Sequence, residues 1–342
     1  MSKRRTTIKD LAVELNTTPS TVSRALRQDP AISKEMRERV QSLAKLMNYR
    51  VNRIASNLRN GKSKTIGVIV PHINRDFFSN VISGIEDVSY DKKYNVIICQ
   101  THDDYAKEVQ YVKTLVSSNA DGILASIGLR TKNIEHFNSA MKLGIPVIFF
   151  DRVSKKSPSI NIVNDDFKGA YIAVSHLIEM GYRRIAHFAG PDYLNVYRDR
   201  KNGYIKALED YGITPDPELV VYNDLKVSGG RSSTQMLLKM ATPPDAIFSA
   251  SDYSALGALL YLKEQGIKIP REMGIVGYSN EKFTELTAPS LTSIDQHGYE
   301  MGQYSAKLFF EEMDKKDNDF LPRTITLTPK LIIRESSSLK NT

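Results

Sequence analysis

The stretch TIKDLAVELNTTPSTVSRALR, residues 7–27, decides how the first part of this 342-residue chain folds. Thr7 stands three residues before Asp10, the spacing at which a hydroxyl and an acidic side chain cap the first turn of a helix. Thr18 followed by Pro19 marks a second helix start, because proline at the first helical position loses no hydrogen bond. The stretch therefore predicts two short helices joined by a tight turn.

The second of these helices has an apolar face and a polar face. Val22, Ala25 and Leu26 recur at helical spacing towards a core. The outward side chains are short donors and one guanidinium: Ser20, Thr21, Ser23 and Arg24. A second helix with a polar N-terminal end is the geometry that places side chains on base edges in a major groove. A third helix, from Ser33 as its cap to Met47, is expected to complete the bundle.

Positive charge is concentrated in the same part of the chain. Residues 1–64 carry 15 Lys and Arg against 5 Asp and Glu, whereas residues 65–342 carry 32 against 34. The alternative to a binding surface is a basic tail that only keeps the protein in solution. The helix pattern favours binding to a polyanion, and we expect double-stranded DNA.

The segment YRVNRIASNLRNGKSK, residues 49–64, is basic, has few apolar residues and ends in Gly, Ser and Lys. This composition predicts a linker. From Thr65 onward, short apolar runs alternate with helical stretches, which predicts parallel strands with crossover helices, the strands being buried on both faces.

The alternation falls into two similar sets, so we expect two α/β lobes with a cleft at the carboxyl ends of the strands. Closure of one lobe on the other is the expected switch. The predicted strands are 65–70, 95–99, 122–125, 146–150, 184–189, 219–222, 246–249 and 274–278. The predicted helices are 77–90, 105–117, 133–143, 197–211, 228–240, 253–265 and 299–313.

Several motifs resemble the lactose-repressor (LacI/GalR) family. They are Thr-Ile-Lys-Asp-Leu-Ala at 7–12, Thr-Val-Ser-Arg-Ala-Leu at 21–26 and Met-Asn-Tyr-Arg-Val-Asn-Arg-Ile-Ala at 47–55, with core landmarks at 188–191, 250–252, 255–258, 276–278 and 289–294. The resemblance covers nearly the whole chain. It implies an all-α helix-turn-helix headpiece with a hinge helix, followed by a two-lobed α/β periplasmic-binding-protein type I core.

The resemblance also implies domain boundaries. Residues 1–48 form the DNA-binding headpiece, 49–64 the hinge helix and linker, and 65–342 the effector-binding and dimerisation core. Within the core, one lobe takes approximately 65–163 with crossings at 280–325, and the other takes 164–279.

The resemblance assigns DNA-contacting positions in the headpiece and hinge. Pro19, Ser20 and Arg24 occupy positions that read bases, and 52–60 is a hinge helix whose Leu58 wedges into the minor groove. The alternative for Leu58 is packing on a neighbouring helix. The base preference at 19 and 20 stays open, because longer polar residues often stand there in the family. The full expected set is Thr7, Thr18, Pro19, Ser20, Thr21, Ser23, Arg24, Asn52, Ala55 and Leu58.

The same resemblance assigns effector-binding positions in the core. Two aromatic residues wall the pocket, and polar residues from both lobes contact the ligand. The expected set is Phe77, Phe78, Asp151, Arg200, Asp252, Ser279, Asn280 and Gln296. The alternatives are core aromatics for the pair at 77 and 78, a strand-end turn at 151, a solvated helix charge at 200 and a helix cap at 252.

One position departs from the family pattern. The family usually has an aspartate directly after Gly-Tyr, whereas this chain has Ser279-Asn280. We predict that the missing carboxylate leaves Arg200 free to pair with an acidic group on the effector, such as a uronic or phosphorylated sugar. The alternative is that Asn280 binds a sugar hydroxyl.

Other functional classes lack their motifs. The single Cys99, expected in the core, excludes an intramolecular disulfide and a multi-cysteine zinc site, and the six histidines show no metal-binding spacing. No nucleophile elbow, P-loop or dinucleotide-binding turn follows a predicted strand. We therefore expect no enzyme activity, no catalytic or metal residues and no cofactor. A solute-binding protein or a sugar-active enzyme on the same core fold remains the alternative.

The chain shows neither a signal-sequence pattern nor an apolar run of about 18 residues, so we expect a cytoplasmic protein without a membrane partner, at the bacterial nucleoid when it binds DNA. The expected partners are a small-molecule effector, either a sugar or a sugar acid, and a second copy of the chain. A homodimer is expected to bind a pseudo-palindromic operator.

Overall fold

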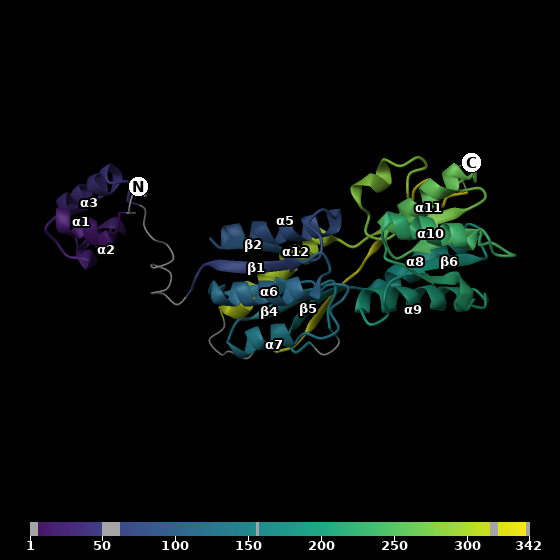
Figure 1. Ribbon diagram of the computed structural model, residues 1–342, viewed down its shortest axis with the longest axis horizontal. Helices are drawn as coiled ribbons and strands as arrows, with labels where there is room; N and C mark the ends of the chain where they lie inside the picture. The colour runs from purple at the N-terminus through teal and green to yellow at the C-terminus, as the bar shows by residue number, and fades with distance from the viewer. Residues whose placement is uncertain (1–5, 50–61, 155–156, 315–320, 340–342) are drawn as a thin grey trace. The chain divides into compact units, whose positions relative to one another are not determined.

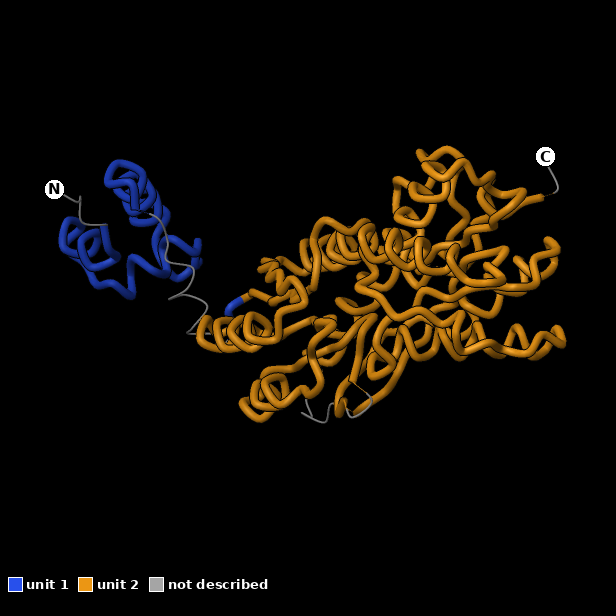
Figure 2. Tube along the Cα trace, turned by 45° about the vertical axis from the view of Figure 1, so that its right-hand side comes forward, with its two compact units in different colours: residues 1–63 blue, residues 64–342 orange. Residues whose placement is uncertain are grey.

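The computed structural model describes residues 6–49, 62–154, 157–314 and 321–339. It divides the chain into two compact units, Met1–Ser63 and Lys64–Thr342, coloured separately in Figure 2. The helices of the described ranges lack the combination of length and hydropathy that a membrane span needs.

The first unit contains three helices: α1 Ile8–Glu14, α2 Pro19–Leu26 and α3 Lys34–Leu46. Each begins at the predicted cap. Thr7 and Asp10 cap each other's backbone amides, the Thr18 hydroxyl accepts from the amide of Thr21, and the Ser33 hydroxyl accepts from that of Met36. The predicted helix starts are confirmed. They could be predicted from the sequence because each cap contacts an amide only three residues away.

A small apolar core holds the three helices together. Its buried side chains are Leu11, Ala12, Val22, Ala25, Val40 and Ala44. Because α2 packs through Val22 and Ala25, its opposite face is left to solvent.

The second unit contains two lobes, each built on a parallel sheet (Figure 1). The first sheet has the order β11-β5-β4-β3-β1-β2. Its strands are β1 Thr65–Val70, β2 Asn95–Gln100, β3 Gly122–Ala125, β4 Val147–Phe150, β5 Ile160–Asn164 and β11 Thr324–Leu327. The helices of this lobe are α5 Asp76–Asp91, α6 Tyr105–Ser117, α7 Glu135–Lys142 and α12 Gly298–Met313.

The second sheet has the order β7-β6-β8-β9. Its strands are β6 Ile185–Ala189, β7 Val220–Tyr222, β8 Ala246–Ser249 and β9 Gly274–Val276. The surrounding helices are α8 Asp166–Glu179, α9 Asn195–Asp210, α10 Val227–Leu237 and α11 Asp252–Glu264, with the short helices η1 Pro217–Leu219 and η2 Lys282–Glu285. An antiparallel pair, β10 Ser293–Asp295 with β12 Lys330–Ile332, completes the lobe.

The described chain crosses between the lobes after β5, after β10 and after β11. The lobes also meet through apolar side chains, because Leu194, Tyr197 and Leu225 of the second lobe join the core cluster that contains Ile127 and Phe149 of the first. The two lobes are therefore closed on each other.

Two features of the core differ from the sequence-based expectation. Strand β2 is not buried on both faces, because it lies at the edge of its sheet and leaves Ile97 and Ile98 exposed at 41% and 48%. Helix α8 and strands β5, β10, β11 and β12 were not predicted. The expected burial of Cys99 is confirmed.

Candidate functional site

The exposed face of α2 presents the side chains expected to read DNA. Thr18, Pro19 and Ser20 are exposed at the start of the helix, and Arg24 lies one turn further along. The Arg24 side chain is 45% exposed, and its Nε donates to Oδ2 of Asp29 at 2.9 Å. That hydrogen bond lowers the pKa of the Asp29 carboxyl. The Arg24 guanidinium therefore stays accessible to solvent while it contacts Asp29.

The remaining expected DNA contacts lie in different surroundings. Thr7 is exposed but its side chain caps α1, while Thr21 and Ser23 are half-buried on α2. Asn52, Ala55 and Leu58 lie outside the described residues.

A cavity lies between the two lobes of the core. Both lobes contribute to its wall. The lining residues are His72, Arg75, Phe77, Phe78, Asp103, Leu129, Asp151, Arg152, Val196, Tyr197, Arg200, Asp224, Leu225, Lys226, Ala250, Ser251, Ser279, Glu281 and Gln296. Of the eight expected effector-binding residues, the structure brings six to this cavity and leaves out Asp252 and Asn280.

The aromatic part of the wall comes from both lobes. Phe77 and Phe78 stand in the first turn of α5, with ring centroids 5.1 Å apart in an edge-to-face arrangement. They also belong to the core cluster of the first lobe, so they both line the cavity and pack the core. Tyr197 of α9 lies in the wall contributed by the second lobe.

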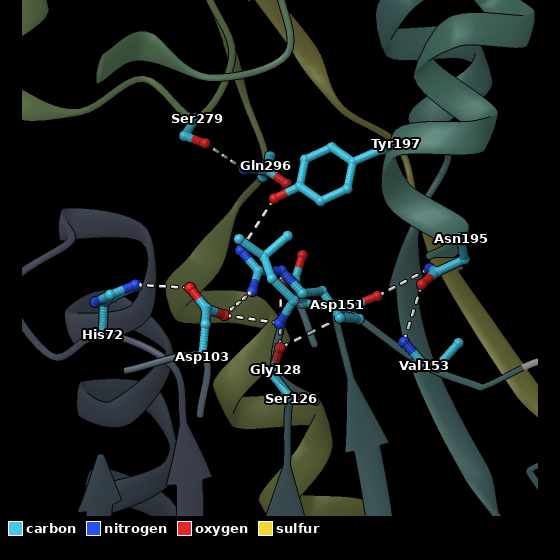
Figure 3. A network of polar contacts seen from close by, with 12 residues as sticks. His72, Asp103, Ser126, Gly128, Asp151, Val153, Asn195, Tyr197, Ser279 and Gln296 are labelled. Carbon is cyan, nitrogen blue, oxygen red and sulfur yellow. Dashed lines mark hydrogen bonds and ion pairs between the residues drawn. The ribbon is translucent and has the colours of Figure 1, made fainter. Parts of the chain in front are cut away.

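A charged network holds the first-lobe side of the cavity (Figure 3). Asp103 accepts from Nη1 of Arg152 at 2.8 Å and contacts Nε2 of His72 at 2.9 Å. Arg152 also donates from Nη2 to the Tyr197 hydroxyl at 3.0 Å, which connects the two lobes. Burial raises the pKa of Asp103, but the charge of Arg152 and the contact with His72 outweigh burial and lower it. Asp103 is therefore an ionised partner for Arg152.

Asp151 lies at the end of β4, where its backbone is left-handed with φ of 59°. Its Oδ2 accepts from the Ser126 hydroxyl at 3.1 Å. Burial raises the pKa of this carboxyl, and the nearby charges of Arg152 and Arg200 act in the opposite direction. Asp151 is thus both a turn residue and a buried carboxyl at the cavity wall.

Arg200 lies on α9 and is held on three sides. Its Nε donates to Oδ1 of Asp166 at 2.8 Å, its Nη1 to the carbonyl oxygen of Ala250 at 2.9 Å, and its Nη2 to Oε1 of Gln296 at 2.9 Å. The guanidinium also stacks 3.7 Å from the centroid of the Tyr278 ring. The prediction that Arg200 is free of local neutralisation is wrong, because Asp166 supplies the carboxylate.

Asp166 is the first residue of α8 and is almost fully buried. Burial raises its pKa to about 6, although the charge of Arg200 opposes that shift. The pair therefore resembles the buried Arg–carboxylate pairs whose disruption leaves an uncompensated charge.

The segment after β9 places Ser279 and Glu281 at the cavity and Asn280 outside it. The Ser279 hydroxyl accepts from Nε2 of Gln296 at 2.8 Å (Figure 3). The Asn280 amide oxygen instead accepts from Nη2 of Arg334 at 2.9 Å. Asp252 accepts from the Ser293 hydroxyl at 2.6 Å and from the Glu281 amide at 2.9 Å, so it supports the loop behind the wall. The helix cap of α11 is Ser251 rather than Asp252.

Sequence reasoning missed three of the charged residues in or behind the wall: Asp103, Arg152 and Asp166. Each follows closely after a strand of the first sheet, namely β2, β4 and β5. A search for charged residues at strand ends could have found Asp103 and Arg152, because the carboxyl ends of parallel strands form one edge of a sheet. Among the described residues, no group of three or more His, Cys, Asp or Glu is arranged to hold a metal ion.

Two family models match the chain. Residues 7–52 match the model described as bacterial regulatory proteins, lacI family, and residues 174–337 match the periplasmic binding protein-like domain. The chain is 31% identical to the HTH-type transcriptional regulator RegA of Clostridium saccharobutylicum over 335 residues, which cover 97% of this chain and 99% of the relative.

Two further similarities extend over most of the chain. The HTH-type transcriptional repressor CytR of Escherichia coli (strain K12) is 32% identical over 307 residues, which cover 90% of this chain and 89% of the relative. Among solved structures, the complex of the transcriptional regulator CelR with cellobiose is similar with a TM-score of 0.73 and 26% identity. That match covers 97% of this chain and 100% of the solved one.

Proposed function

The chain belongs to the lacI family of bacterial regulatory proteins, and on that premise we propose that it represses carbohydrate-utilisation genes under the control of a sugar or sugar derivative bound in the interlobe cavity. It is a DNA-binding transcriptional regulator and not an enzyme, since the relatives that match nearly its whole length are regulators.

The observation that carries the proposal is the mixture of cationic and acidic side chains around the cavity. Four cationic side chains line it, Arg75, Arg152, Arg200 and Lys226, together with four acidic ones, Asp103, Asp151, Asp224 and Glu281. The two buried guanidiniums are each paired with a carboxylate. A ligand with hydroxyl groups can donate to the carboxylates and accept from the cations without bringing a charge of its own.

Two further observations favour a sugar. Phe77 and Phe78 provide an apolar wall beside the polar groups, and a sugar ring has both an apolar face and a polar rim. The similar regulator CelR was solved with cellobiose. Since Asp166 balances Arg200, we propose a neutral sugar as the effector and not a uronic or phosphorylated one.

The headpiece is the proposed operator-binding part. The exposed ends of Pro19, Ser20 and Arg24 on α2 reach base edges, and the basic residues around them contact phosphates. We propose the boundaries 1–48 for the headpiece, 49–64 for the hinge and linker, and 65–342 for the core. One headpiece offers few base contacts, so a homodimer binds a pseudo-palindromic site. We propose the bacterial cytoplasm as its location, at the nucleoid when it is bound to operator.

A thermal-shift screen tests the effector proposal. The full-length protein is heated with neutral pentoses, hexoses and disaccharides, and with the matching uronic acids and sugar phosphates. A ligand that binds only the folded state raises Tm. We expect a neutral sugar to give the largest shift, and the same sugar to change the affinity for DNA from the protein's own promoter region.

Two results contradict the proposal. A larger shift with the acidic member of a matched pair shows that the cavity is built for an anion. A neutral sugar that raises Tm but leaves operator binding unchanged shows that the cavity does not control the headpiece.

A further inference from the structure

Helix α5 of the first lobe is capped by the second lobe. Its own cap residue, Arg75, makes no side-chain capping hydrogen bond. Instead the amide of Asp76, the first helical residue, donates to Oε2 of Glu281 at 2.7 Å. A helix N-terminus carries unsatisfied amides and a partial positive charge, so the carboxylate of Glu281 stabilises it.

A second hydrogen bond runs from the second lobe to the first. The amide of Lys282, the first residue of η2, donates to Oδ2 of Asp76 at 2.7 Å. Asp76 and Glu281 thus satisfy backbone amides on each other's segments, 205 residues apart in the chain. The two contacts are reciprocal, like those of a capping box, but they join residues of different lobes.

Neighbouring residues hold this contact in place. The Arg75 guanidinium lies 3.3 Å from the centroid of the Tyr253 ring, so a cation–π contact also crosses between the lobes. On the second lobe, Asp252 fixes the Glu281 amide at 2.9 Å, and the Thr284 hydroxyl donates to the Glu281 carbonyl at 2.6 Å. The backbone of Glu281 is therefore fixed by contacts within the second lobe.

A second cross-lobe contact involves Asn195, the first residue of α9 (Figure 3). Asn195 donates from Nδ2 to the carbonyl oxygen of Asp151 at 2.9 Å and accepts at Oδ1 from the amide of Val153 at 2.9 Å. Opening the lobes must break both contacts, because each joins one lobe to the other.

We propose that Asp76 and Glu281 form a reciprocal latch that holds the lobes closed and sets the fraction of the protein in the closed state. Glu281 lines the cavity, whereas Asp76 does not. A bound ligand can therefore contact one carboxyl oxygen of Glu281 while the other oxygen still accepts from the Asp76 amide of α5. Such a ligand favours the closed state. Because apparent affinity scales with the closed fraction, a weakened latch lowers effector affinity without removing a ligand contact.

The latch is tested by amide hydrogen exchange, followed by mass spectrometry, on the full-length protein without effector or DNA. Asp76→Ala removes the acceptor of the Lys282 amide and leaves Asn195 untouched. If the lobes open together, exchange speeds up about threefold or more in three separate peptides. One covers position 76, one contains Lys282 and one contains the distant Val153. Faster exchange at Lys282 alone means a local cap and overturns the proposal.

Two further variants complete the experiment. Asp91→Ala removes a carboxylate from the other end of α5 and leaves the exchange pattern unchanged. Glu281→Ala removes the acceptor of the Asp76 amide and is expected to give the same pattern as Asp76→Ala, including at Val153, and a normal rate at Val153 again overturns the proposal. Neither measurement uses a ligand, so failure of the latch leaves the proposed effector and operator binding standing.

Discussion

The exposed face of α2 and the interlobe cavity treat charge in opposite ways. On α2 the Arg24 side chain is 45% exposed and pairs with the carboxylate of Asp29. In the cavity the Arg200 side chain is 5% exposed and has hydrogen-bond partners at all three nitrogens. An exposed cation can bind phosphate and donate to base edges. A buried cation that is already paired with a carboxylate suits a neutral ligand that brings no charge of its own.

The largest expected effect is on the buried pair. Arg200→Met leaves the Asp166 carboxyl buried without its partner, so we expect the free energy of unfolding to fall by about 3–5 kcal/mol. Binding of the sugar selected by the thermal-shift screen is expected to fall about 100-fold or more. Urea unfolding and calorimetric titration measure the two changes.

The double variant Arg200→Met/Asp166→Asn serves as the control. It removes the uncompensated carboxyl and is expected to recover most of the stability but not the sugar affinity. A single Arg200→Met protein as stable as its parent contradicts the assignment of a buried charge pair.

The second expected effect is a loss of stability at acidic pH, caused by a buried neutral histidine in the second lobe. His187 on β6 is buried between Tyr204 and Phe248, and burial lowers its pKa from 6.5 to about 4 despite its contact with a backbone carbonyl. The unfolded chain takes up this proton first as pH falls. The stability contributed by neutral His187 is therefore lost between pH 6.5 and 4, by about 3 kcal/mol.

His187→Phe isolates this effect, because Asp166 and Asp252, with pKa values raised by burial to about 6, act in the opposite direction over the same pH range. Urea unfolding of both proteins from pH 7 to pH 4 gives the difference. We expect the variant to lose less stability than the parent, and equal losses contradict a buried neutral histidine.

The third effect concerns the exposed cation. Arg24→Ala is expected to weaken operator binding about 10- to 100-fold and to narrow the preference for operator over unrelated duplex, since a good base contact contributes about 1–3 kcal/mol of discrimination. Fluorescence anisotropy with both duplexes measures the ratio. Lys45→Ala, in the last turn of α3, is the matched control. We expect it to lower the affinity for both duplexes by the same factor. A ratio that is unchanged in Arg24→Ala rules out base reading by this residue.

The smallest effect comes from the neighbour of Arg24. Asp29→Asn removes one negative charge from the headpiece surface, so we expect DNA affinity to rise about two- to fivefold at low salt and the gain to shrink as salt screens the charge. Anisotropy titrations at several salt concentrations measure this. A loss of affinity means instead that Asp29 holds Arg24 in its reading position.

The contrast between the two regions also explains what the sequence could predict. The headpiece helices were predicted to within one or two residues because Thr7, Thr18 and Ser33 act on amides three positions away. Strands β1, β3 and β8 were predicted at their observed bounds because each is a continuous apolar run.

The part of the cavity that was missed depends on distant partners. Helix α8 is buried over most of its surface, so it lacks the amphipathic pattern that marks a surface helix. Its first residue, Asp166, pairs with Arg200 at a separation of 34 residues. No local signal connects the two, and the prediction of a free Arg200 failed for that reason.

The central claim is that operator reading and ligand binding belong to different units of the chain. The most direct test titrates Arg24→Ala, side by side with the parent protein, with operator DNA and with the sugar from the thermal-shift screen. We predict an operator affinity at least about 10-fold weaker and a sugar affinity within about twofold of the parent. A comparable loss of both affinities would contradict the claim.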